Sequence, residues 1–180
     1  MSTPPTLNQP IPGRHCDSCT LCCKVMGITE LQKARGTWCK HCLPGKGCGI
    51  YATRPAECRS FFCGWLLDPR LGPEWKPSRS KIVLTPTPDG NGIAVRCDPG
   101  FPDAWRRYPF YDTILEWAQT AKAHDGTVIV CVGSKMTVVA PEGEFPLGDV
   151  GDDDLIGREF SGHKLVGVRV MKAKSTNGTT

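Results

Sequence analysis

The clearest pattern of hydrophobic and polar positions lies in the second half of the chain. Residues 81–85 and 92–97 are short apolar runs, and the turn-rich residues 87–91 separate them. Residues 109–123 instead repeat apolar side chains every three or four positions, which is typical of a helix that packs on one face. The chain therefore predicts two strands and then a helix, whose apolar stripe consists of Tyr111, Ile114, Leu115, Ala118 and Ala121.

Three more strands are expected after this helix. Residues 127–132 and 135–140 are rich in β-branched side chains, and only a Gly-Ser pair separates them. A two-residue link that begins with glycine is typical of a type II′ β-hairpin. After an acidic, glycine-rich loop at about residues 141–154, a last strand is expected at 165–171. The second half is therefore interpreted as ββαβββ, with one sheet and one packed helix.

Proline and glycine divide the chain into segments. Residues 1–13 are rich in proline and polar side chains, which predicts a disordered tail, and residues 174–180 are expected to form a loose tail. The proline-dense residues 68–78 are expected to connect a cysteine-cluster metal-binding module at 14–67 to an α+β domain at 79–173. The expected fold class is α+β, a small metal-stapled cysteine-rich module followed by a ββαβββ single-sheet region.

Composition limits the classes of function. The chain has 180 residues, of which 39% are hydrophobic, and a formal net charge of +4. Its basic residues are scattered, so nucleic acid is not favoured as a partner. The N-terminus has no secretory signal and no apolar run has the length of a membrane span, so we expect a cytoplasmic protein without a membrane partner. Thiols stay reduced in the cytoplasm, which favours metal ligation over disulfides.

Nine of the eleven cysteines fall within residues 16–63. The spacing Cys-x-x-Cys lets one short turn present two sulfurs to the same ion. Thiolates are soft ligands, suited to zinc, copper(I) or iron–sulfur centres. The predicted metal ligands are Cys16, Cys19, Cys22, Cys23, Cys39, Cys42, Cys48, Cys58 and Cys63.

Nine thiols exceed the four ligands of one structural zinc site. Two four-cysteine sites would use eight of them, and so would one zinc site beside one iron–sulfur cluster. Cys16, Cys19 and Cys22 have the spacing that opens the bacterial ferredoxin run, but Cys23 follows at once and no Cys-Pro occurs. The expected cofactor is therefore zinc or iron, and an iron–sulfur cluster is one form that the iron would take.

Several residues allow more than one role. In one interpretation, the adjacent cysteines Cys22 and Cys23 bind two different metal ions. In the other, one of them binds a metal ion while the other packs in the core. His41 is a candidate zinc ligand, but cysteine is abundant beside it, which favours a solvent-facing side chain or a donor to a ligand. Cys97 and Cys131 stand alone in predicted strands, which indicates small core residues.

Two arginines stand close to the thiols in sequence. Arg54 and Arg59 would offset thiolate charge by donating to ligand sulfurs, or they would pair with Glu57. Pro55 is predicted at the first position of a short helix that continues to Phe62.

The cysteine module resembles a known family. The segment Cys16-x2-Cys19-x2-Cys22-Cys23 is followed by Gly47-Cys48-Gly-Ile-Tyr51-x2-Arg54-Pro55-x2-Cys58-Arg59-x-Phe61-x-Cys63. In order and spacing these residues are similar to the YkgJ-type CxxCxxCC cysteine-cluster family, over roughly residues 14–66. That family is described as a zinc- or iron-chelating domain and includes flagellin lysine N-methylases.

This resemblance implies which cysteines bind metal without assigning each of them to an ion. The pair Cys39 and Cys42 looks like one branch of the family. The other implied ligands are Cys16, Cys19, Cys22, Cys23, Cys48, Cys58 and Cys63.

Three hypotheses of function follow. The first is a metal-binding protein that acts as a chelator, carrier or structural adaptor. The alternative is an iron–sulfur-dependent enzyme or a methylase-like protein modifier. The third is an interaction module, in which the metal only stabilises the fold and the sheet domain binds a protein partner. No catalytic residue is predicted, because the candidate acid–base groups are scattered, namely His124, Asp125, Asp149 and His163.

Overall fold

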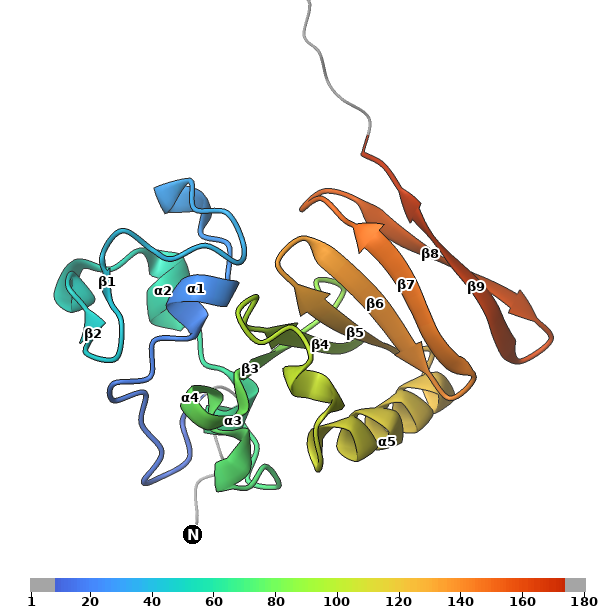
Figure 1. The fold of residues 1–180 in the computed structure, drawn as a ribbon, viewed down its shortest axis with the longest axis horizontal. Helices are drawn as coiled ribbons and strands as arrows, with labels where there is room; N and C mark the ends of the chain where they lie inside the picture. The colour runs from blue at the N-terminus through green and yellow to red at the C-terminus, as the bar shows by residue number, and fades with distance from the viewer. Residues whose placement is uncertain (1–8, 174–180) are drawn as a thin grey trace, which may run out of the picture.

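The computed structural model describes residues 9–173, so most of the predicted N-terminal tail and all of the predicted loose tail at 174–180 lie outside the described part. Figure 1 shows two lobes, one built from the short elements of the cysteine-rich region and one built around a sheet. The expected α+β class is confirmed, because helices and three sheets share the chain. Among the described residues, no helix is both long and apolar enough to cross a membrane.

The sheet lobe contains a five-stranded sheet and the longest helix described. Its elements are β3 (Ile82–Pro86), β4 (Gly92–Cys97), α5 (Phe110–Ala123), β5 (Thr127–Val132), β6 (Lys135–Ala140) and β7 (Gly143–Asp149). The strand order is β3-β4-β5-β6-β7. β4 and β5 run parallel, which requires a crossover connection, and α5 supplies it. The other neighbouring strands are antiparallel.

The predicted strands and helix up to β6 are confirmed, with bounds that differ by one residue at most. Gly133, in the turn between β5 and β6, takes the positive φ of 61° that the first position of a type II′ turn requires. Residues 141–154 were expected to be a loop, and they contain β7. The strand pattern of β7 is weak because Pro146 and glycines interrupt it.

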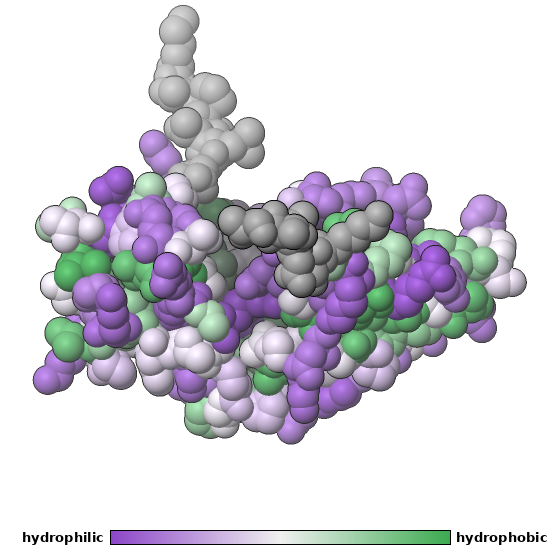
Figure 2. Space-filling model, turned by 90° about the horizontal axis from the view of Figure 1, so that it is seen from above, coloured by the Kyte–Doolittle hydropathy of each residue, from purple (hydrophilic) through white to green (hydrophobic). Residues whose placement is uncertain are grey.

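The last predicted strand is present but belongs to a separate sheet. It corresponds to β9 (Lys164–Met171), which pairs with β8 (Leu155–Ser161) rather than with the five-stranded sheet. This hairpin covers part of the face opposite α5, where Leu165 packs with Ile129 and Val138. On the face shown in Figure 2, hydrophobic residues form separate patches between hydrophilic ones.

The main core lies between α5 and the sheet. Ile114 is fully buried there, beside Val95 and Val128 of the neighbouring strands. Cys97 belongs to this core and Cys131 to the core on the opposite face, so the prediction that both are core residues is confirmed.

The cysteine lobe consists of short elements. They are α1 (Cys22–Val25), η1 (Thr29–Leu31), β1 (Cys42–Leu43), β2 (Gly47–Cys48), η2 (Tyr51–Thr53), α2 (Ala56–Ser60) and α3 (Gly64–Leu67). The short helix predicted from Pro55 to Phe62 is α2, but it is shorter than predicted, because Pro55 is its N-cap and it ends at Ser60. Three more short helices connect or flank the lobes, η3 (Pro73–Trp75), α4 (Pro77–Ser80) and η4 (Ala104–Arg106).

The cysteine lobe packs against β3. A Cβ atom at Gly64 in α3 would lie 2.9 Å from the Cβ of Leu84, so this close approach requires glycine. Val83, which is fully buried, joins Leu66 and Cys63 in a small core. The edge strand of the sheet is therefore also part of the cysteine lobe's interior.

Replacing Ile114 with alanine is expected to lower the free energy of unfolding by about 2–5 kcal/mol, because this fully buried side chain would leave a cavity between α5 and the sheet. Urea denaturation followed by circular dichroism measures the loss. Gln119→Ala, on the exposed face of the same helix, is the control and should change stability by less than about 0.5 kcal/mol. A loss below about 1 kcal/mol for Ile114→Ala would contradict this packing.

Candidate functional site

The predicted metal ligands gather around one cavity of about 240 Å³. Apart from the thiols its wall is largely apolar, with Met26, Trp65 and Val83 among the lining residues. The cysteines that line it are Cys16, Cys19, Cys22, Cys23, Cys39, Cys48, Cys58 and Cys63. The remaining predicted ligand, Cys42, lies opposite Cys48 in the β1–β2 ladder, so it is a neighbour of the cavity.

Two of the Cys-x-x-Cys segments are tight turns closed by a backbone hydrogen bond. The N–H of Cys19 donates to the carbonyl of Cys16 over 2.7 Å, and the N–H of Cys42 donates to the carbonyl of Cys39 over 3.0 Å. Asp17, in the first turn, has a φ of 44°, a conformation that aspartate adopts more readily than most residues. Each turn holds its two cysteines at one bend of the chain.

α1 connects the adjacent cysteine pair to the other turns. The N–H of Cys39 donates to the carbonyl of Cys23 over 2.9 Å, and the N–H of Gly45 donates to Oγ1 of Thr20 over 3.2 Å. Gly45 and Gly47 have φ values of 73° and 127°, which glycine adopts without strain. The Pro-Gly-Lys-Gly segment thus lets the β1–β2 turn fold back on α1.

Two glutamates fasten α2 to η1. Oε2 of Glu57 accepts a hydrogen bond from the N–H of Thr29, and Oε1 of Glu30 accepts one from the N–H of Ala56, both over 3.0 Å. This exchange fixes the position of Cys58 in the middle of α2. Glu57, one of the two alternatives considered as partners for Arg54 and Arg59, thus accepts a backbone hydrogen bond.

The adjacent cysteines differ in acidity. The thiol of Cys22 donates a hydrogen bond to Cys23 and lowers the pKa of Cys23 to about 6, and the Cys42 thiol and the Lys33 ammonium act in the same direction. The same hydrogen bond, together with burial, raises the pKa of Cys22. At pH 7 the metal-free pair therefore holds one thiol, on Cys22, and one thiolate, on Cys23.

Other thiols of the cavity are held in the protonated form. Burial raises the pKa of Cys42 and of Cys63, each to about 11. Burial also raises the pKa of Cys16 and of Cys58, while the charge of Arg54 opposes the shift. A metal ion that binds these sulfurs would therefore have to displace protons.

The chemistry of the donor set fits a soft metal, because the thiols line one space and all eleven cysteines are free of disulfides. The positions of the thiols match a metal site less well than their chemistry does. Within residues 9–173, no three side chains of His, Cys, Asp or Glu are arranged as a ligand set. Binding of a metal would therefore require thiols of the cavity to move closer together.

Sequence reasoning missed Lys33. Its ammonium donates to the carbonyls of Lys24 and Ala34, over 3.1 and 3.2 Å, and to the carbonyl of Met26. It thereby lies at the end of α1 and close enough to Cys23 to act on its pKa. No spacing pattern marks this lysine, because its role depends on how the chain folds back.

No family model, curated protein or solved structure matches this chain. The similarity to the YkgJ-type family therefore stays a resemblance, carried by the cysteine spacing and its flanking residues.

Replacing Cys22 with alanine removes the donor to Cys23, so the pKa of Cys23 is expected to rise from about 6 toward the usual thiol value of about 8.5. The pH profile of Cys23 alkylation by iodoacetamide, read residue by residue by mass spectrometry in metal-free protein, should shift its midpoint upward accordingly. At pH 7 the variant should then hold less thiolate. Cys131, whose pKa burial raises, is the internal control and should stay unreactive. An unchanged midpoint near pH 6 would contradict the contact.

Gly64→Ala is expected to push α3 away from β3, because the new methyl group would lie 2.9 Å from the Cβ of Leu84. The expected loss of stability is about 1–3 kcal/mol, measured by urea denaturation. Since Cys63 directly precedes α3, its alkylation should accelerate while that of Cys39 serves as the reference. Unchanged stability and an unchanged Cys63 rate would show that the two elements do not pack as described.

Proposed function

We propose that this is a metal-binding protein whose cysteine-lined cavity holds zinc or iron, with an iron–sulfur cluster as one form of the iron centre. The observation that carries the proposal is the gathering of thiols from separate turns and helices around one cavity. Thiolates are the soft donors that such centres use. The residues that would hold the metal are Cys16, Cys19, Cys22, Cys23, Cys39, Cys42, Cys48, Cys58 and Cys63.

The cavity has room for more than one metal ion. At about 240 Å³ it is many times larger than the roughly 10–15 Å³ that one water molecule needs. Four thiolates complete a structural zinc site or hold an iron–sulfur cluster. The number of thiols therefore suits two zinc ions, or one zinc ion and one cluster.

The charges around the cavity suit a thiolate centre. Lys33 and Arg54 act on the cavity thiols as cations, so they would offset part of the negative charge of metal-bound thiolates. Because most of these thiols are protonated at neutral pH, metal binding would release protons. The affinity for metal should therefore fall as the pH falls.

A metal centre would also stabilise the lobe that holds it. The helices and strands α1, β1, β2, α2 and α3 are only two to five residues long. Elements of this length contribute little stability by themselves. Thiolate bonds to a shared centre would cross-link them, as metals do in other small domains.

A reducing compartment suits this function, and we propose the cytoplasm. All eleven cysteines are free. Reduced thiols persist in the cytosol, whereas oxidising compartments favour disulfides.

Anaerobic purification followed by elemental analysis and a visible spectrum is the decisive measurement. A brown protein with broad absorption near 400 nm (roughly the region of sulfur-to-iron charge transfer) would identify a cluster held by thiolates. A colourless protein with about two zinc ions per chain would identify paired four-cysteine sites. A protein that is folded and free of metal after anaerobic purification would contradict the proposal.

Cys39→Ser and Cys58→Ser are expected to lower the metal content, because each removes a thiol from the cavity wall. Cys131→Ala is the matched control, since it removes a thiol buried in the sheet and should leave the metal content unchanged. A chelator should lower the melting temperature of the wild-type protein and should affect the two cavity variants less. Equal metal content in all of these proteins would exclude the cavity as the site.

A further inference from the structure

Residues 24–38 form a loop that begins and ends beside cysteines of the cavity. Cys23 precedes the loop and Cys39 follows it, and the N–H of Cys39 donates to the carbonyl of Cys23 over 2.9 Å. Inside the loop, the backbones of Ile28 and Lys33 exchange two hydrogen bonds of 3.0 Å. The Lys33 ammonium adds three more contacts to backbone carbonyls of the same loop. These bonds tie residues 24–34 together. Arg35 and Gly36 follow directly and lie close to Cys39 in the chain, so a movement of Cys39 is expected to shift them.

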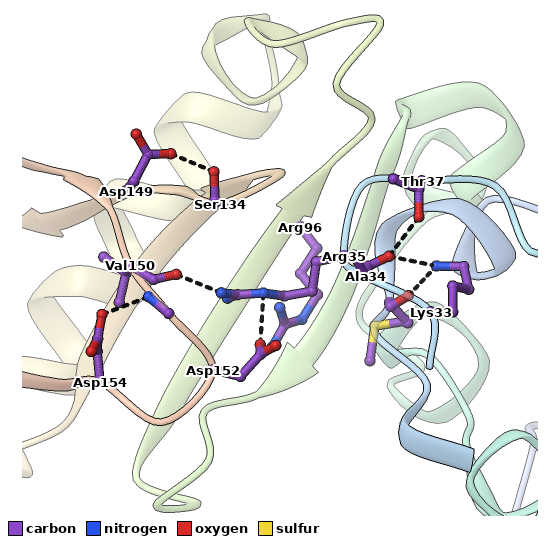
Figure 3. A network of polar contacts seen from close by, with 12 residues as sticks. Lys33, Ala34, Arg35, Thr37, Arg96, Ser134, Asp149, Val150, Asp152 and Asp154 are labelled. Carbon is purple, nitrogen blue, oxygen red and sulfur yellow. Dashed lines mark hydrogen bonds and ion pairs between the residues drawn. The ribbon is translucent and has the colours of Figure 1, made fainter. Parts of the chain in front are cut away.

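Near its C-terminal end this loop reaches the sheet lobe, as Figure 3 shows for Arg35. Arg35 donates through Nη2 to the carbonyl of Val150 over 2.5 Å, and its Nε lies 2.8 Å from Oδ1 of Asp152. The side chain of Arg35 is only 13% exposed. A Cβ atom at Gly36 would lie 3.0 Å from the Cα of Gly133, in the turn between β5 and β6. Arg35 and Gly36 are therefore packed against that turn and the segment after β7.

The segment after β7 in turn holds both ends of the β8–β9 hairpin. The N–H of Val150 donates to the carbonyl of Ser134 over 2.9 Å, and the Val150 side chain is buried. Asp154, which precedes β8, accepts hydrogen bonds from the N–H of Gly151 over 2.6 Å and from Lys172, which follows β9, over 2.8 Å. A shift of Val150 is therefore expected to displace the residues at which the hairpin begins and ends.

We propose that residues 24–38 couple the cysteine cavity to the β8–β9 hairpin, with Arg35 as the contact between the lobes. Occupancy of the cavity draws Cys23 and Cys39 inward, shifts Arg35 and Gly36 and changes the hold of Arg35 on Val150 and Asp152. The coupling rests on the proposed metal function, because metal binding is its trigger. The link between Arg35 and the two cysteines is tested without metal. Coupling between two sites is reciprocal, so loss of the Arg35 contact alters the exposure of the two cysteines.

The first experiment uses the reduced, metal-free full-length chain. Arg35→Gln is expected to raise the alkylation rates of Cys23 and Cys39 by about fivefold or more, the lower end of typical couplings between sites. Mass spectrometry gives the alkylation rate of each cysteine. The reagent concentration is chosen so that this rate is proportional to the population of molecules in which the loop has opened. Arg169→Gln is the control, because it removes an exposed ion pair with Glu159 within the hairpin and should leave both rates unchanged.

The second experiment adds zinc chloride and follows hydrogen exchange at the amides of Val150 and Gly151. Zinc is expected to change this exchange in the wild-type protein and not in Arg35→Gln, although both proteins bind zinc. Asp152→Asn keeps the contact between Arg35 and the Val150 carbonyl. It should therefore accelerate the alkylation of Cys23 and Cys39 less than Arg35→Gln does, and it should reduce the zinc-dependent change in exchange without abolishing it. This second variant decides the matter if Arg35→Gln does not fold.

The outcomes separate the coupling from the metal function. Equal alkylation rates in the Arg35 variant and the wild type would overturn the coupling. Unchanged exchange at Val150 and Gly151 in a wild-type protein that has bound zinc would also overturn it, and the metal function would then stand. If the wild-type protein binds no metal, the proposed function fails and the alkylation rates alone decide the coupling.

Discussion

β3 is the strand on which both lobes depend. Successive side chains of a strand point to opposite faces, and this alternation gives two neighbouring residues opposite roles. Leu84 packs into the core under α5, whereas Val83 packs beside Cys63 and lines the cysteine cavity. Gly64 allows α3 to approach the same strand closely. A one-residue slip of β3 would exchange these roles and disturb the sheet core and the cavity wall together.

The cavity also places many ionisable thiols close to one another. As thiolates they would repel each other, and burial makes each charge more costly. The metal-free protein avoids this cost by keeping Cys42 and Cys63 protonated and by sharing one proton between Cys22 and Cys23. Lys33 offsets only part of any further charge. A soft cation would stabilise several thiolates at once, which links the protonation of this cavity directly to its affinity for metal.

Sequence patterns predicted correctly those elements that depend on residues close together in the chain. The apolar stripe of α5 and the Gly-Ser turn between β5 and β6 are examples, because each depends on residues within a few positions. The clustering of thiols was predicted from spacing, since short turns bring them together. β7 was missed because Pro146 and its glycines resemble a loop. Lys33 and Val83 were missed as parts of the site, because only the tertiary fold brings them to the cysteines.

The topology of the sheet explains why one loop contacts so many segments. β4 and β5 are parallel, and both β5 and β7 are antiparallel to β6. The C-terminal ends of β4, β5 and β7 therefore lie at the same end of the sheet. Both ends of the segment 24–38 reach this end of the sheet. Lys24 pairs with Asp98 after β4 over 2.5 Å, Gly36 contacts the turn after β5, and Arg35 binds Val150 after β7. A displacement of this one loop would therefore act on three strand ends at once, which a contact with a single strand could not do.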